Sequence, residues 1–150
     1  VVSDVPSALV LERAKTAGIE TKVIPFRNPR SQWDLELLTY VELVNPDLVV
    51  SVGFMRILSS EFVTKFKVIN SHPALLPSFP GAHAVRDALK AGATHTGCTV
   101  HWVDEGVDTG KIIAQMRVEI EPNDNEATLH ERIKIVERKL IVETIKSLEI

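Results

Sequence analysis

Strand-like runs of apolar residues alternate with helix-like segments along the whole chain. The pattern predicts strands at 1–3, 21–24, 48–52, 68–71, 96–103 and 111–120, and helices at 7–17, 31–44, 61–66, 82–91 and 125–148. Ser7 and Ser31 are expected to cap the first two helices, because a side-chain oxygen there accepts a hydrogen bond from a free backbone N–H. Gly18 and Gly92 are expected to end the first and fourth helices.

This order of elements indicates an α/β fold with a doubly wound, mainly parallel sheet and helices on both faces. The apolar run at 48–52 predicts a strand that is buried on both of its faces. Two strands follow each other after Gly97 with no helix between them, which predicts an antiparallel strand pair near the C-terminus. The chain has no repeat, low-complexity tract or interdomain linker, so we expect a single domain.

Composition narrows the class of protein further. The 150 residues carry a net charge of −3, so no basic patch argues for nucleic acid as a partner. No apolar run is long enough to span a bilayer and no secretory signal precedes the first helix, so we expect no membrane partner and a cytoplasmic protein. The single Cys98 excludes an internal disulfide. His83, His95 and His130 lack ligand spacing, so no metal is expected.

Residues 70–81, NSHPALLPSFPG, are the strongest candidate for a site. If the segment before them is a strand, Asn70 and His72 project to the same side and can address one reacting group. The amide can polarise a carbonyl while the imidazole moves a proton. Three prolines then restrict the backbone that follows. On composition alone, an ordinary Pro-rich connection with a buried histidine is an equal alternative.

A second cluster follows the expected strand at 96–103. Residues 104–110, DEGVDTG, place three acids and two glycines between two strands. Such acids are often no more than the solvated tip of a hairpin. However, one carboxylate from this loop with an asparagine and a histidine elsewhere would supply a base, a residue that orients it, and a donor to an oxyanion.

Four segments carry a resemblance to a known family: 53–58 (GFMRIL), 70–81, 101–110 (HWVDEGVDTG) and 130–137 (HERIKIVE). Together they resemble the folate-dependent formyltransferase family, and in particular its phosphoribosylglycinamide formyltransferase (glycinamide ribonucleotide transformylase) branch. The resemblance implies the formyltransferase fold. It also implies an enzyme that transfers a formyl group from 10-formyltetrahydrofolate, as co-substrate, to the amine of glycinamide ribonucleotide in de novo purine biosynthesis, without a metal.

The resemblance also implies roles for individual residues. Asn70, His72 and Asp108 match the catalytic triad, with Asn70 and a charged His72 donating to the oxyanion. Seven residues match the folate pocket: Met55, Arg56, Ile57, Leu58, His101, Val103 and Asp104. Lys134 is placed near the substrate phosphate, and Glu137 near its ribose or amine. From the residues alone, Lys134 and Glu137 are equally a solvated ion pair one helical turn apart, and His101 is equally a core residue.

The chain opens at what resembles the family's second strand. We therefore expect residues 1–150 to form one formyltransferase domain that lacks the family's first strand and Gly-rich phosphate loop, as a monomer or homodimer. Two alternatives stay open: a formyltetrahydrofolate deformylase, in which water replaces the amine, and a folate-binding domain without activity. A Gly-rich turn upstream of Val1 would favour the transferase, and a regulatory domain there would favour the deformylase.

Overall fold

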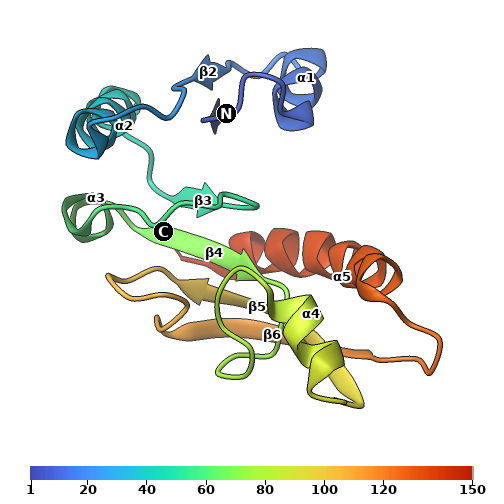
Figure 1. The fold of residues 1–150 in the computed structure, drawn as a ribbon. Coiled ribbons are helices and arrows are strands. Elements are labelled where there is room, and N and C mark those ends of the chain that lie inside the picture. Colours follow the sequence, from blue (N-terminus) through green and yellow to red (C-terminus); the bar gives the residue numbers. More distant parts are fainter. Residues whose placement is uncertain (150) are drawn as a thin grey trace. The chain divides into compact units, whose positions relative to one another are not determined.

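The protein was analysed as a computed structural model that describes residues 1–149. The chain forms two compact units, one from Val1 to Pro46 and one that begins at Asp47 (Figure 1). The expected single domain stays a prediction. Within the described residues, every helix is too short or too polar to span a bilayer.

The first unit contains β1 (Val2–Ser3), α1 (Leu9–Thr16), β2 (Lys22–Val23) and α2 (Arg30–Val44). The two strands pair in parallel, as expected for strands joined through a helix. Trp33 of α2 is 1% exposed and its indole N–H donates to the carbonyl of Ile24 at 2.9 Å, which ties the helix to the segment after β2. The order of strand, helix, strand and helix in this unit confirms the predicted alternation of strands and helices.

The predicted caps of these two helices are wrong. Ala8 and Pro29 hold the N-cap positions, and neither provides a side-chain hydrogen bond. Ser7 lies one residue before its cap position, and Ser31 already lies inside the first turn of α2 because the proline before Arg30 sets the helix start. The predicted end of α1 is correct, since Gly18 follows it with a φ of 70°.

The second unit is built on a four-stranded sheet in the order β3-β4-β5-β6. Its strands are β3 (Val49–Ser51), β4 (Val68–His72), β5 (His95–Trp102) and β6 (Ile112–Glu119). β3 and β4 pair in parallel, whereas β5 is antiparallel to both β4 and β6. The antiparallel pair predicted after Gly97 is therefore confirmed.

The prediction that residues 48–52 are buried on both faces is wrong. β3 is partly exposed, and Val50 at its centre is 37% exposed. The physical reason lies in the topology of the second unit, where β3 occupies the edge of the sheet and has a strand neighbour on one side. An apolar run therefore identified a strand here, but not its position in the sheet.

Three helices complete the second unit: α3 (Ser60–Lys65), α4 (Ala84–Lys90) and α5 (Glu126–Ser147). Asn125 begins α5 through a reciprocal capping box with Thr128. The helix then lies along β5 and β6 (Figure 1). It buries Leu129, Ile133, Leu140 and Ile141 against the sheet residues Ile69, Cys98, Val100 and Val118 and against Val85 of α4. This core fixes α5 beside the carboxyl end of β4.

Candidate active site

A cleft of about 680 Å³ opens in the second unit at the carboxyl ends of β3 and β4. Its lining comes from the loop after β3, the end of β4, the start of α4, the loop after β5 and one side of α5. All the residues expected in the site line this cleft: Met55, Arg56, Ile57, Leu58, Asn70, His72, His101, Val103, Asp104, Asp108, Lys134 and Glu137. The structure thus brings together residues as far apart in the sequence as Met55 and Glu137.

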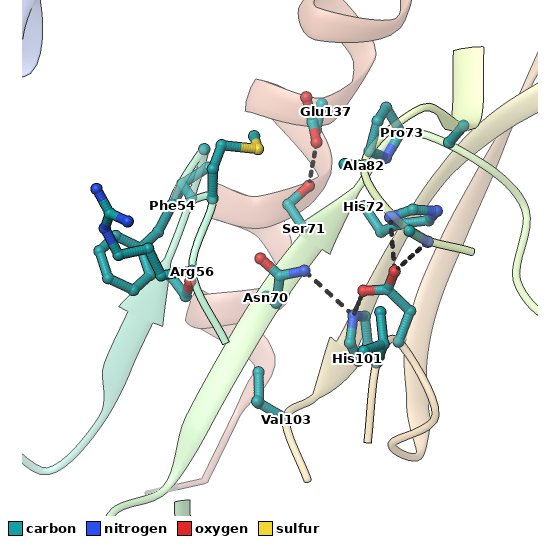
Figure 2. A pocket seen from close by; sticks show the side chains of 18 of the residues that line it. Phe54, Arg56, Asn70, Ser71, His72, Pro73, Ala82, His101, Val103 and Glu137 are labelled. Carbon is teal, nitrogen blue, oxygen red and sulfur yellow. Dashed lines mark hydrogen bonds and ion pairs between the residues drawn. The ribbon is translucent and has the colours of Figure 1, made fainter. Parts of the chain in front are cut away.

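The alternation of β4 sets the first part of the site. Asn70 pairs across the sheet with His101, and His72 pairs with Thr99. Asn70 Nδ2 lies 3.3 Å from His101 Nε2, as Figure 2 shows. Both imidazoles are buried, with His72 4% and His101 1% exposed. A neutral amide donor and two imidazoles are therefore held on rigid strands.

The hydrogen bonds of His101 determine which of its nitrogens carries a proton. Its Nδ1 lies 2.8 Å from the carbonyl of Trp102, and since a carbonyl can only accept, Nδ1 carries the proton. Nε2 can then accept from Asn70 in the neutral ring, or donate to Asp108 Oδ1, 3.5 Å away, in the charged ring. Burial acts to lower the pKa of His101, but its contacts with Asp108 and the Trp102 carbonyl outweigh burial and raise it.

Asp108 bridges the two histidines. Its Oδ2 accepts a hydrogen bond from the Gly81 N–H at 2.8 Å and lies 3.4 Å from His72 Nδ1, while its Oδ1 faces His101. The hydrogen bond with His101, the Gly81 N–H and the nearby imidazoles hold the pKa of Asp108 below its ordinary value. The loop presents this carboxylate from a backbone with a φ of 55°. An ionised carboxylate is thus fixed between two imidazoles.

His72 is held by the Pro-rich loop that follows it. Its Nε2 donates to the carbonyl of Phe79 at 2.8 Å, so its Nδ1 faces Asp108. That second contact is attractive when Nδ1 also carries a proton. The ring is therefore placed to be a doubly donating imidazolium between a carbonyl and a carboxylate.

The same loop is fixed to the sheet by four residues, which we name the loop clamp: Ala74, Leu76, Thr99 and Gln115. The Thr99 hydroxyl donates to the Ala74 carbonyl at 2.7 Å and accepts from the Leu76 N–H at 3.0 Å. The Gln115 amide donates to the Leu76 carbonyl and to the Thr99 hydroxyl, each at 2.9 Å. The loop that holds His72 is thereby bound to β5 and β6.

The opposite side of the cleft differs in character. Exposed apolar side chains of the loop after β3 form what we name the apolar wall: Val52, Met55 and Ile57, which are 55%, 78% and 55% exposed. Phe54 and Arg56 lie on the same loop after β3 (Figure 2). A flat apolar ligand placed here would cover surface that is now open to water.

The α5 side of the cleft holds Lys134 and Glu137. The alternative of an ion pair between these two residues is wrong, because Lys134 Nζ contacts Glu131 Oε1 at 2.6 Å. Glu137 Oε1 instead accepts a hydrogen bond from the hydroxyl of Ser71 at 2.7 Å, as Figure 2 shows. Both residues expected near a substrate therefore lie in the cleft, but with partners that the sequence did not indicate.

Several residues that hold the site together were not predicted from the sequence: Ser71, Phe79, Gly81, Thr99 and Gln115. Phe79 and Gly81 act through backbone groups, for which side-chain identity gives no signal. The cross-strand register of β4 and β5, had it been assigned, would have paired His101 with Asn70 and Thr99 with His72. Among residues 1–149, no group of His, Cys, Asp or Glu side chains is arranged to hold a metal ion.

This arrangement suits reactions at a carbonyl group. An amide N–H and an imidazole can donate to an oxygen that becomes negative, and an adjacent carboxylate can move a proton. A covalent nucleophile is not part of this set, since the thiol of Cys98 is buried and its burial raises its pKa to about 11.

Comparisons with known proteins agree with this geometry. The profile of a family described as formyl transferase matches residues 1–145. Phosphoribosylglycinamide formyltransferase of Mycobacterium tuberculosis H37Rv is 51% identical over 121 residues, which are 79% of this chain and 56% of that protein. The trifunctional purine biosynthetic protein adenosine-3 of Homo sapiens is 44% identical over 144 residues, or 93% of this chain and 14% of that protein. The chain spans about half the length of the first of these relatives.

Solved structures show the same fold. Phosphoribosylglycinamide formyltransferase from Streptococcus pneumoniae TIGR4 superposes with a TM-score of 0.92 at 37% identity, covering 98% of this chain and 84% of that one. Glycinamide ribonucleotide transformylase 1 from Symbiobacterium toebii gives a TM-score of 0.93 at 38% identity, covering 97% and 70% of the two chains. These superpositions confirm the α/β fold class predicted from the sequence.

Proposed function

Because the chain belongs to the formyl transferase family, we propose that it transfers a formyl group from 10-formyltetrahydrofolate to the amine of glycinamide ribonucleotide in purine biosynthesis. The observation that carries the proposal is one network of polar contacts in a single cleft: Asp108 contacts His72 and His101, and Asn70 joins the network through His101. It agrees with the names of the relatives, which are formyltransferases and purine biosynthetic proteins.

In the proposed reaction, the substrate amine attacks the formyl carbon and the carbonyl electrons move to oxygen. Asn70 stabilises that oxyanion through its amide. Its Nδ2 carries two protons, and one contact with His101 leaves the second for the oxyanion. Removal of such a donor costs about 2.7–4 kcal/mol of barrier in other enzymes.

His72 is the second donor to the same oxygen. Its Nε2 proton, which rests on the Phe79 carbonyl in the free protein, can be redirected when substrate enters the cleft. The carboxylate of Asp108 faces Nδ1 at 3.4 Å and orients the ring. Two donors from alternate positions of β4, Asn70 and His72, then face the developing charge.

Collapse of the tetrahedral intermediate requires a proton transfer. The new ammonium loses a proton, the bond from the formyl carbon to the folate nitrogen breaks, and that nitrogen gains a proton. Asp108 can relay this proton directly or through one water, because its carboxylate is ionised. The products are the formamide and tetrahydrofolate, and no group of the protein changes its oxidation state.

The two ligands have separate places in this proposal. The folate ring system covers the apolar wall, with Arg56 and Asp104 at its edges and Leu58, His101 and Val103 as further contacts. The ribonucleotide lies toward α5, with Lys134 near its phosphate and Glu137 near its ribose or amine. A cytoplasmic location and a monomer or homodimer complete the proposal.

The proposal is tested by incubating the purified protein with 10-formyltetrahydrofolate, with and without glycinamide ribonucleotide. We expect tetrahydrofolate and formylated ribonucleotide to appear in equal amounts, and little tetrahydrofolate when the amine is left out. Equal release of formate in both reactions would overturn the proposal in favour of hydrolysis. Folate binding without turnover in either reaction would indicate a binding domain.

A further inference from the structure

Ser71 occupies a special position between the two halves of the proposed site. On β4 it lies between Asn70 and His72, so its side chain points to the other side of the strand. It is 6% exposed, and Figure 2 shows it directed at Glu137 of α5. The strand that carries the oxyanion donors and the helix that borders the substrate side are therefore joined by one side-chain contact.

The chemistry of this contact is well defined. A serine hydroxyl has one proton, and Ser71 donates it to Glu137 Oε1 at 2.7 Å, a short distance that suits a charged acceptor. Within residues 1–149, no Lys, Arg or His lies within ion-pair distance of Glu137. The carboxylate thus keeps Oε2 and its negative charge for a group that enters the cleft.

The negative charge of Glu137 also affects the pKa of Cys98, a buried residue of the sheet. Burial is the main reason that the pKa of the Cys98 thiol is raised, and the negative charge of Glu137 adds to the rise. Cys98 is part of the core beneath α5. The side chain of Glu137 is half-buried at the edge of the cleft, where the hydroxyl of Ser71 holds it.

We propose that Ser71 is a positioning residue that fixes the carboxylate of Glu137 so that its second oxygen faces a hydrogen-bond donor of the substrate. The class of group selected is a hydroxyl or amine, since an ionised carboxylate can only accept. This inference rests on the proposed function, because that function assigns the ribonucleotide to the α5 side of the cleft.

The expected effect follows from preorganisation. A free glutamate on a helix surface samples many rotamers, and immobilising it on binding weakens affinity by roughly 3- to 10-fold. The hydrogen bond from Ser71 already restricts the side chain of Glu137 in the free protein. Most of this loss of affinity is therefore avoided when the ribonucleotide binds. Its contribution should therefore be found in the KM for the ribonucleotide, with little effect on kcat or on the KM for the folate.

The test uses Ser71→Ala, Ser71→Val and Ser71→Thr in the purified protein. Valine and threonine have the same shape and differ in the hydroxyl, so their ratio isolates the hydrogen bond even if both crowd the core. We expect Ser71→Ala and Ser71→Val to raise the KM for glycinamide ribonucleotide about 3- to 10-fold. Ser71→Thr should restore a KM close to that of the unchanged protein.

A double-mutant cycle with Glu137→Ala, which removes the acceptor of the Ser71 hydroxyl, completes the test. If Ser71 acts through Glu137, Ser71→Ala should add less than about twofold to the KM of the Glu137→Ala protein. An undiminished loss in that background, an unchanged KM in Ser71→Ala, or equal KM values for the Val and Thr variants would overturn the proposal. Failure of the proposed function is distinguished from these outcomes, because it abolishes formyl transfer in the unchanged protein.

Discussion

The two sides of the cleft are built in opposite ways. On the polar side, His72 and His101 are buried, Asn70 and Asp108 are half-buried, and the four side chains are joined by polar contacts. The apolar wall is exposed, and Met55 in it is 78% exposed. Rigid donors lower a reaction barrier because they need no reorganisation, whereas exposed apolar surface provides binding energy once a ligand covers it. We infer that the polar side sets the rate and the apolar wall sets the folate affinity.

The two sides of the cleft also differ in the elements that carry their side chains. Asn70, His72 and His101 lie on paired strands, and the loop clamp holds the segment that contains Phe79. Met55 and Ile57 lie on a loop between β3 and α3. Loops of this kind adapt to a ligand at low cost, but strands keep side chains at fixed spacing. The comparison therefore predicts that substitutions on the two sides separate kcat from KM.

The largest effect is expected for Asn70→Ala. Because the oxyanion exists only along the reaction path, kcat should fall about 100- to 1,000-fold while the KM for the folate stays within about twofold. Steady-state kinetics with both substrates measures the two constants. Equal losses in kcat and in folate affinity would show that Asn70 is a binding residue.

A smaller effect is expected from breaking the loop clamp. Thr99 is fully buried, and Thr99→Val keeps its shape but leaves the Leu76 N–H and the Ala74 carbonyl without their partner. Such a change should lower the free energy of unfolding by about 1–3 kcal/mol. Denaturant unfolding measures it, and kcat should fall as well because the loop positions Phe79 and Gly81.

Thr96→Val is the matched control for this prediction. Thr96 lies on the same strand, is 2% exposed, and its hydroxyl has no hydrogen-bond partner within the described residues. Removal of an unpartnered hydroxyl should be neutral or stabilising. If Thr96→Val destabilised the protein as much as Thr99→Val, the loss would reflect the packing of β5 and not the clamp.

The sequence predicted the elements well, and the candidate site residues that it indicated lie together in the structure. Strands and helices follow from local apolar patterns, and the segments at 53–58, 70–81, 101–110 and 130–137 carry the family resemblance that assigned the twelve site residues. All twelve line one cleft. Their roles in catalysis and binding stay predictions.

The contacts within the site could not be predicted because they depend on tertiary geometry. The partner of Glu137 is Ser71, which is 66 residues away, and the partner of Lys134 is Glu131. The prediction that β3 is buried on both faces was also wrong, because an apolar run does not reveal whether a strand is central in the sheet or at its edge. The periodicity of apolar residues indicates which face of a strand or helix a residue lies on, but not which residues of other elements contact that face.

The apolar wall should respond differently from Asn70. Met55→Ala should raise the KM for the folate roughly 3- to 10-fold, because less apolar surface is covered on binding, while kcat stays within about twofold. Ile135→Ala is a suitable control, since Ile135 is 65% exposed on α5 and does not line the cleft. A fall in kcat with an unchanged folate KM in Met55→Ala would contradict the division between the two sides.

The smallest effect concerns the pH dependence of stability on the polar side. The pKa of His101 is raised above 6.5, so its contribution to folding is complete below that value and is lost as the pH rises through the raised pKa. The pKa of Asp108 is lowered below 3.8, so its contribution is present above that value and is lost as the pH falls through the lowered pKa. Both contributions are therefore complete between about pH 4 and pH 6.5.

His101→Gln isolates this effect, because the amide keeps a polar atom near Asn70 and Asp108 but does not titrate. The difference in unfolding free energy between the unchanged protein and His101→Gln should shrink by about 1 kcal/mol between pH 6 and pH 9, a modest value since the contact of 3.5 Å with Asp108 is longer than a good hydrogen bond. Denaturant unfolding at several pH values measures the difference. In an Asp108→Asn background the pH dependence should be weaker, and an unchanged dependence there would show that the charge of His101 is stabilised mainly by other groups, such as the Trp102 carbonyl.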